Sequence, residues 1–257
     1  MKTFIETFIV AFSMYSKIPM PQVEWNEKNM RFSLTVFPMV GVVIAAALYF
    51  LFYIFTHLNF SPVFFGAVAV FLPLLITGGL HLDGYCDTVD ALCSRKECSE
   101  KLRILKDPHT GAFAVIYTVA LLILQFGAWC QVFLTPVCFY TLLFCFIFSR
   151  ALVSLSLVTF PCAGSTGLAS IFAGNTSKGV VKYILACMII LCLAAMFYLM
   201  VVAASVILIL VLASYIWFYF MTRKHFGGLT GDLAGFYIVV CETLVLITAS
   251  ILGGIMA

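Results

Sequence analysis

Long apolar stretches alternate with short polar joints along most of the chain. Seven stretches approach the roughly 20 residues that an α-helix needs to cross a lipid bilayer, and they lie at 33–56, 61–80, 111–134, 136–160, 180–200, 201–221 and 233–256. The boundary near Met200 is the least distinct, because residues 180–221 form one apolar stretch without turn residues. The pattern predicts an all-α, polytopic integral membrane bundle of about seven transmembrane helices, forming a single domain over residues 1–257.

A shorter apolar pattern precedes the first span. Large apolar side chains recur there at helical spacing, namely Phe4, Ile5, Phe8, Ile9 and Phe12. Glu6 interrupts the stretch and no small-x-small cleavage pattern follows, which argues against a signal peptide. We therefore expect an amphipathic helix at the membrane interface, ended by Pro19 and Pro21.

The composition agrees with a membrane protein. Hydrophobic residues make up 64% of the chain and charged residues only 10%, against about 25% charged residues in soluble domains. This excludes a disordered chain and disfavours a soluble globular enzyme. The 10 cysteines are scattered, some of them inside apolar runs, without the spacing of a disulfide framework. We interpret them as small apolar residues.

Nearly all charged residues fall in alternate joints. Joints such as 59–62 carry no charge, whereas residues 1–31 hold four and residues 81–110 hold five of the 14 lysines and arginines. The positive-inside rule then places the N-terminal segment 1–31 and the acidic loop 81–110 in the cytoplasm. The odd number of predicted spans places the C-terminus on the opposite side.

The acidic residues gather in one segment. Six of the 11 fall within 81–110, and among them Asp83, Asp87 and Asp90 are four and three residues apart, so they share one face of a helix. Three carboxylates this close repel one another, and a divalent cation that prefers oxygen ligands, Mg²⁺ or Mn²⁺, relieves the repulsion. The alternative is that the aspartates cap a helix, a role that needs one aspartate rather than three.

A polar motif lies downstream, just before the third span. Lys106 can reach a phosphate, and Asp107 is a candidate for a further metal ligand or a base. Pro108 stops the preceding helix and Gly111 permits a turn into the membrane.

His81 and several glycines border the acidic face. A lone histidine is more often a hydrogen-bonded structural residue than a general base, although its usual pKa suits a base. Gly84, like Gly78 and Gly79, fits a tight turn or a close approach of two backbones. A zinc site is a weak alternative. Its ligands would be His81, Cys86, Cys93 and Cys98, and their spacing does not match the two pairs of ligands that are usual in zinc sites.

Two ionisable groups fall inside the predicted spans, and such groups are functional candidates by default. They are Arg150 and Glu242, and Asp232 opens the span that holds Glu242. Two interpretations stay open, a structural Arg150–Glu242 ion pair or direct catalytic roles. Helix rise places Glu242 about 15 Å from Asp232, too far to share one Mg²⁺, which favours the pair.

The motifs together resemble one known family. They read His81-Leu-Asp83-Gly84-x-x-Asp87-Thr-x-Asp90, then Lys106-Asp107-x-x-x-Gly111-Ala-Phe, then Thr230-Gly231-Asp232-x-x-Gly235 with Glu242. This series resembles cobalamin synthase, the adenosylcobinamide-GDP ribazoletransferase family, and the similarity covers most of the chain. Residues 91–94 lack the glycines common there, which affects loop geometry but removes no candidate ligand.

The resemblance implies an enzyme of late nucleotide-loop assembly in cobalamin biosynthesis. Such an enzyme joins adenosylcobinamide-GDP to α-ribazole or its 5′-phosphate and releases GMP, with Mg²⁺ as the cofactor and Mn²⁺ as its substitute. The implied metal ligands are Asp83, Asp87, Asp90 and Asp232, with Asp107 as a further one. The implied substrate-binding residues are Gly84, Lys106 and Gly111. The implied catalytic residues are His81, Lys106, Asp107 and Arg150. Lys106 and Arg150 would contact phosphates, and His81 and Asp107 are the candidate bases.

The resemblance also implies a setting. The partners are the two small-molecule substrates and the lipid bilayer, without nucleic acid, and a homo-oligomer is left open. The site is expected to face the cytoplasm from the cell membrane of a bacterium or an archaeon.

Two rival functions stay open, a related membrane enzyme and, from a different class, a transporter. A CDP-alcohol phosphotransferase also carries aspartates at three- and four-residue offsets, but its Asp-Gly-x-x-Ala-Arg pattern is not met, because Tyr-Cys-Asp follows Asp83-Gly84. A cation-coupled transporter often shows inverted repeats and broken helices at mid-membrane. Neither is visible in this sequence, and its acidic residues gather at the cytoplasmic edge.

Overall fold

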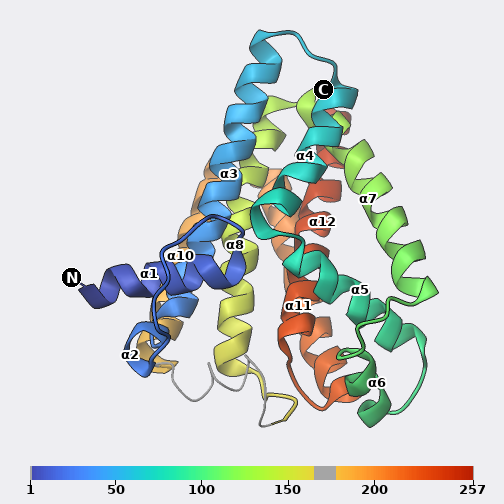
Figure 1. The fold of residues 1–257 in the computed structure, drawn as a ribbon. Helices are drawn as coiled ribbons and strands as arrows, with labels where there is room; N and C mark the ends of the chain where they lie inside the picture. Colours follow the sequence, from blue (N-terminus) through green and yellow to red (C-terminus); the bar gives the residue numbers. More distant parts are fainter. Residues whose placement is uncertain (1, 165–177, 257) are drawn as a thin grey trace.

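The computed structural model describes residues 2–164 and 178–256. Over these ranges the chain is a helical bundle, and one isolated β-bridge is its only extended pairing. The helices drawn in Figure 1 are α1 (Lys2–Tyr15), α2 (Glu27–Met30), α3 (Ser33–His57), α4 (Pro62–Thr77), α5 (Leu80–Cys93), α6 (Cys98–Ile104), α7 (Ala112–Phe133), α8 (Pro136–Thr159), α10 (Lys178–Leu199), α11 (Val201–Phe226) and α12 (Gly231–Met256).

Six of these helices are long and apolar enough to cross a membrane: α3, α7, α8, α10, α11 and α12. Most of their ends lie within two residues of the predicted ends, because composition and turn residues decide both. The indistinct boundary is also confirmed, since Met200 has extended backbone (φ −150°, ψ 94°) between α10 and α11. Only α11 is clearly longer than predicted, and it ends at Phe226 instead of residue 221.

The predicted span 61–80 has a different form. α4 ends at Thr77, and Gly78 and Gly79 both adopt left-handed backbone with φ of 66° and 76°. Left-handed conformations favour glycine, and two in succession turn the chain, so that α5 leaves α4 at 96°. The pair counts as a seventh span only when taken together, and we take α4, its apolar arm, as the part within the membrane.

The acidic segment 81–110 is correspondingly more ordered than the loop that the sequence predicts. It holds helix α5 and the short helix α6. Figure 1 shows α2 and α6 toward the same end of the bundle as the junction of α11 and α12, with α1 crossing nearer the middle, while the C-terminus lies toward the other end. The joints that carry the charges therefore lie at one end of the molecule, as their alternation predicts.

The predicted N-terminal helix is present as α1, but its apolar face is divided. Phe4 and Ile5 are 68% and 54% exposed, whereas Phe12 and Tyr15 are buried. The Tyr15 ring lies 4.0 Å from that of Phe37 on α3, measured between centroids. The second half of α1 is thus part of the core, and the first half offers apolar side chains to the surroundings, as an interfacial helix requires.

The acidic helix α5 is fixed by close packing on α12. A Cβ atom at Gly84 would lie 2.6 Å from the backbone oxygen of Asp232, and one at Gly235 would lie 3.3 Å from the backbone of His81. Beside this crossing the rings of Tyr85 and Phe236 stack with centroids 5.6 Å apart. The close backbone approach predicted at Gly84 is confirmed, and it brings the first turns of α5 against the start of α12.

Replacing Gly84 by alanine should separate these helices. The added methyl group would overlap the Asp232 backbone, which cannot move like a flexible side chain, so we expect a loss of about 1–3 kcal/mol, seen as a lower melting temperature in detergent. Gly127→Ala on α7 is the matched control, because a Cβ there has no neighbour within 4 Å and should be neutral or stabilising by up to about 1 kcal/mol. Equal melting of Gly84→Ala and the parent would contradict this packing.

Candidate functional site

The acidic face predicted from the spacing exists as one face of α5. Asp83 is exposed, and Asp87 and Asp90 are half-buried. The crossing at Gly84 adds Asp232 from the first turn of α12. Carboxylates from two segments far apart in the sequence therefore meet where α5 crosses α12.

The charges of this group influence one another. The pKa of Asp87 is raised to about 6, first by burial and then by the neighbouring carboxylates of Asp83, Asp232 and Asp90. A divalent cation would relieve this repulsion, so the donor set fits Mg²⁺ in chemistry and charge. In the described part of the chain, however, no three Asp, Glu, His or Cys side chains are already gathered into a metal-binding group. The magnesium site therefore stays a prediction.

Asp90 has a role that differs from that of its neighbours. Its Oδ2 accepts a hydrogen bond from the backbone N–H of Gly111 at 2.6 Å, and its Oδ1 accepts one from Ala114 at 2.9 Å. These are free N–H groups at the start of α7, so Asp90 caps that helix from a distant segment. Both oxygens of Asp90 thus make capping hydrogen bonds, and its role as a metal ligand stays a prediction.

Gly111 and Asp107 also bind locally. Gly111 lies against Asp90, where a Cβ atom would come within 2.7 Å of the carboxylate oxygens. Asp107 accepts from the backbone N–H of His109 at 3.0 Å and pairs with its Nδ1 at 2.7 Å. The two bonds lower the pKa of this exposed carboxyl, which weakens Asp107 as a base. Lys106, in contrast, interacts electrostatically with Asp232.

A cavity of about 110 Å³ lies at the crossing, between α1, α3, α5, α8 and α12. His81, Asp83 and Asp232 line it together with apolar side chains such as Phe37. His81 is buried, and within the described residues its Nε2 has no hydrogen-bond partner. Of the two candidate bases, His81 is therefore the one that shares a cavity with the carboxylates.

The two intramembrane charges form the ion pair that the sequence left open. A nitrogen of the Arg150 guanidinium lies 2.6 Å from Glu242 Oε1, and it also donates to the backbone oxygen of Phe146 at 2.8 Å. Ser149 Oγ donates to the same Glu242 oxygen at 2.9 Å. Arg150 is only 1% exposed and held by these partners, so the ion pair is confirmed. A catalytic role for Arg150, including its phosphate contact, stays a prediction.

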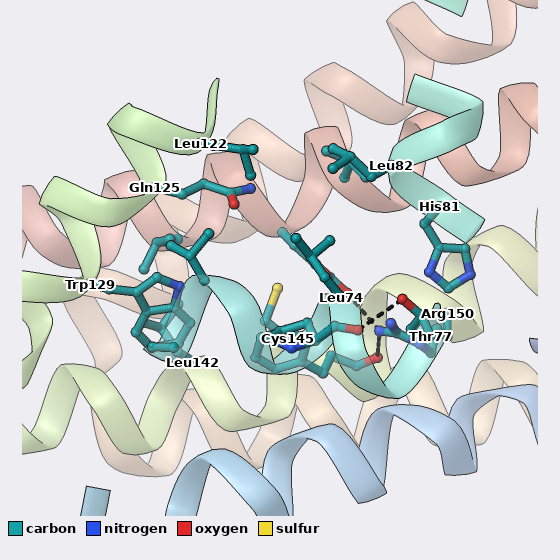
Figure 2. A pocket seen from close by; sticks show the side chains of 17 residues that line it. Leu74, Thr77, His81, Leu82, Leu122, Gln125, Trp129, Leu142, Cys145 and Arg150 are labelled. Carbon is teal, nitrogen blue, oxygen red and sulfur yellow. Dashed lines mark hydrogen bonds and ion pairs between the residues drawn. The ribbon is translucent and has the colours of Figure 1, made fainter. Parts of the chain in front are cut away.

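A second cavity, of about 60 Å³, adjoins this pair and is shown in Figure 2. Thr77, His81, Gln125 and Trp129 line it, and Figure 2 shows Arg150 at its edge near Thr77 and His81. Arg150 Nε has no partner among the described residues. His81 borders both cavities and so stands between the carboxylates and the ion pair.

The zinc alternative receives no support. Cys86 Sγ contacts Thr118 Oγ1 at 3.1 Å, and in the residues that the structure describes no metal-binding group includes the cysteines near His81.

A backbone contact that the sequence did not reveal supports the start of α12. The Leu229 N–H donates to Pro161 oxygen at 2.8 Å, and the Ala163 N–H donates to Leu229 oxygen at 3.1 Å. This bridge joins the end of α8 to the turn before Asp232. No periodicity or motif announces it, because one isolated bridge leaves no repeating pattern.

Comparison with known proteins identifies the family of this arrangement. The model of the cobalamin-5-phosphate synthase family matches residues 7–250. The chain belongs to this family. The matched range contains every candidate site residue, and it confirms the resemblance inferred from the motifs.

Named relatives of the family cover nearly the whole chain. An adenosylcobinamide-GDP ribazoletransferase of Lachnoclostridium phytofermentans is 36% identical over 91% of this chain and 89% of its own length. Proteins of the same name from Clostridium perfringens and Clostridium botulinum are 33% and 34% identical, over 94% and 97% of this chain and 96% and 98% of their own lengths. No solved structure matches the chain.

The buried ion pair predicts a double-mutant effect. Glu242→Gln leaves Arg150 charged and unpaired, at a cost of about 3–5 kcal/mol. Arg150→Gln should cost less, because a carboxyl can bind a proton whereas a guanidinium stays charged. In detergent melting curves the double variant should recover much of the loss. As a control, Arg103→Gln breaks an exposed pair with Glu100 and should cost at most about 1 kcal/mol. A double variant no more stable than the worse single variant would refute the pairing.

The cap made by Asp90 predicts a graded loss of stability. Asp90→Ala removes both acceptors and should lower the free energy of unfolding by about 1–2 kcal/mol, while Asp90→Asn keeps one acceptor and should lose less. Asp83→Asn is the matched control, since in the described residues the Asp83 side chain caps no neighbouring helix, and its melting temperature should stay close to the parent's. If Asp90→Ala melts like Asp83→Asn, the cap contributes nothing.

Proposed function

We propose that this protein is a Mg²⁺-dependent membrane transferase that joins adenosylcobinamide-GDP to α-ribazole or its 5′-phosphate and releases GMP. The observation that carries the proposal is the acidic face of α5 meeting Asp232 of α12, in a chain that matches the cobalamin-5-phosphate synthase family over residues 7–250. The relatives are named adenosylcobinamide-GDP ribazoletransferase, and this name supports the proposed substrates.

The proposed reaction is a phosphoryl-group transfer. A hydroxyl oxygen of α-ribazole attacks the phosphorus on the cobinamide side of the diphosphate, and a new P–O ester bond forms. The phosphoanhydride bond breaks, GMP leaves with the bonding electrons, and the hydroxyl proton passes to a base. Such a transfer requires mainly the alignment of the reactants and the neutralisation of charge.

The residues at the crossing fit these requirements. Asp83, Asp87 and Asp232 would hold Mg²⁺, with Asp90 contributing only what its capping bonds leave free. When bound, the ion would neutralise charge on the diphosphate oxygens. Lys106, which interacts with Asp232, would contact a phosphate oxygen, and His81 lines the same cavity as the proposed ligands.

We place this site on the cytoplasmic side of a bacterial or archaeal cell membrane. The support is the distribution of cations, because residues 1–31 and 81–110 hold nine of the 14 lysines and arginines (four and five). Figure 1 shows α2 and α6, which belong to these segments, toward one end of the bundle. Positively charged joints remain in the cytoplasm during membrane insertion.

Product analysis tests the function. The purified protein in detergent should release GMP from adenosylcobinamide-GDP only when α-ribazole and Mg²⁺ are both present, and a chelator should stop the release. Asp83→Asn and Asp87→Asn should each lower the rate by at least about 100-fold without a fall in melting temperature, because they remove only the charges that bind the ion.

Glu100→Gln is the matched control, since Glu100 is a surface carboxylate of α6 paired with Arg103, and it should keep the parent's rate. Release of CMP from a CDP-alcohol would favour the lipid phosphotransferase instead. A protein that turns over neither substrate but binds and transports a cation would favour the transporter. Rates within a few-fold of the parent in both aspartate variants would end the metal-site proposal.

A further inference from the structure

A second opening reaches the acidic face from the N-terminal side. It is a cleft of about 570 Å³ between the end of α1 and the bend that joins α4 to α5. One wall is formed by residues 13–17 and the other by residues around Gly78, Gly79 and Asp83. The cleft is therefore built by two segments that lie far apart in the sequence.

Lys17 is the cation of this cleft. Its backbone N–H donates to the Ile76 oxygen at 2.8 Å, which ties the segment after α1 to the last turn of α4. Its methylene groups lie directly on Gly78, where a Cβ atom would collide with them. The bend thus lies against the stem of this lysine, and the positive φ of Gly78 favours glycine there.

The charged end of Lys17 is free to bind a ligand. The residue is exposed, and in the described part of the chain no ion pair or hydrogen bond engages its ammonium group. Asp83 lines the same cleft and also the cavity shared by His81 and Asp232. A free cation and a proposed metal ligand therefore face one open space, and Asp83 links that space to the reaction site.

The reaction needs a cation at this position. A diphosphate carries negative charge on both phosphates, and positive groups on either side of it both hold it and stabilise charge during transfer. Two cations were predicted to contact a phosphate, and one of them, Arg150, forms an ion pair with Glu242. Lys106 interacts with Asp232. The sequence therefore predicted no cation that would contact a phosphate on the Asp83 side of the site.

We propose that the cleft between residues 13–17 and the α4–α5 bend binds the diphosphate of the nucleotide-activated substrate, with Lys17 as its cationic contact. This inference rests on the proposed function and deepens it. The anion lies between the Lys17 ammonium on one side and the carboxylates of α5, with their metal, on the other. The α4–α5 bend then serves binding directly, because it holds Lys17 and Asp83 on the two walls of one cleft.

Charge and packing can be separated at this position. Lys17→Met keeps an unbranched stem on Gly78 and removes the charge, whereas Lys17→Arg keeps the charge. Lys28→Met is the matched control, since Lys28 is an exposed lysine of the same N-terminal segment. We expect Lys17→Met to raise KM for adenosylcobinamide-GDP about tenfold or more, with KM for α-ribazole within about twofold and an unchanged melting temperature. Lys17→Arg should stay within about threefold of the parent, and Lys28→Met should match it.

Equilibrium binding of GDP, which needs no turnover, is the second measurement. Lys17→Met should weaken GDP binding about tenfold relative to the parent and to Lys28→Met, because one charge-assisted contact is lost. If the parent binds GDP in this way but releases no GMP from the proposed substrates, the proposed function fails and the anion site stands. Equal GDP affinity and equal KM in Lys17→Met and the parent would overturn the site. The site would also be overturned if Lys17→Met and Lys17→Arg both lowered the melting temperature while GDP affinity stayed unchanged. Lys17 would then contribute to packing alone.

Discussion

The close contact of α5 with α12 is the interaction on which the rest of the site depends. Gly84 lets the backbone of α5 touch that of Asp232, and no larger residue would allow the two helices to approach so closely. The contact turns a row of aspartates on one helix into a group drawn from two helices. It also orders the bend after α4, because α5 can reach α12 only if the chain leaves the axis of α4 at a steep angle.

The cost of placing charge near or within a membrane explains how the polar groups are distributed. Arg150 and Glu242 lie deep in the bundle, and they are matched there by each other, by Ser149 and by a backbone carbonyl. Desolvation makes an unpaired charge expensive at that depth, so removing one partner alone should destabilise the bundle. Among the described residues no ion pair of this kind neutralises the carboxylates at the crossing, although Asp90 accepts two backbone hydrogen bonds and Asp232 interacts with Lys106. Burial, and then repulsion by the neighbouring carboxylates, raises the pKa of Asp87, and a carboxyl group with a raised pKa is typical of a binding site.

Residues on one face of a helix can have different roles, as Asp83, Asp87 and Asp90 show. All three lie on one face of α5, yet Asp90 caps α7 while Asp83 faces a cavity and a cleft. The cap also has a functional consequence, since it links the acidic helix to the segment that ends in Gly111 and carries Lys106. The acidic helix α5 and the segment that carries Lys106 are therefore joined by hydrogen bonds as well as by packing.

Local pattern determined much of this protein from the sequence. The spans, the break at Met200, the amphipathic first helix and the shared face of the aspartates follow from hydropathy, turn residues and helical spacing, which depend on neighbours in the chain. The tertiary structure alone decided which distant groups meet. The pairing of Arg150 with Glu242, the cap from Asp90, the bridge at Leu229 and the placement of Lys17 beside Asp83 each join segments far apart in sequence. Such contacts arise when helices pack, and packing depends on shape and charge across the whole bundle, so no local pattern encodes them.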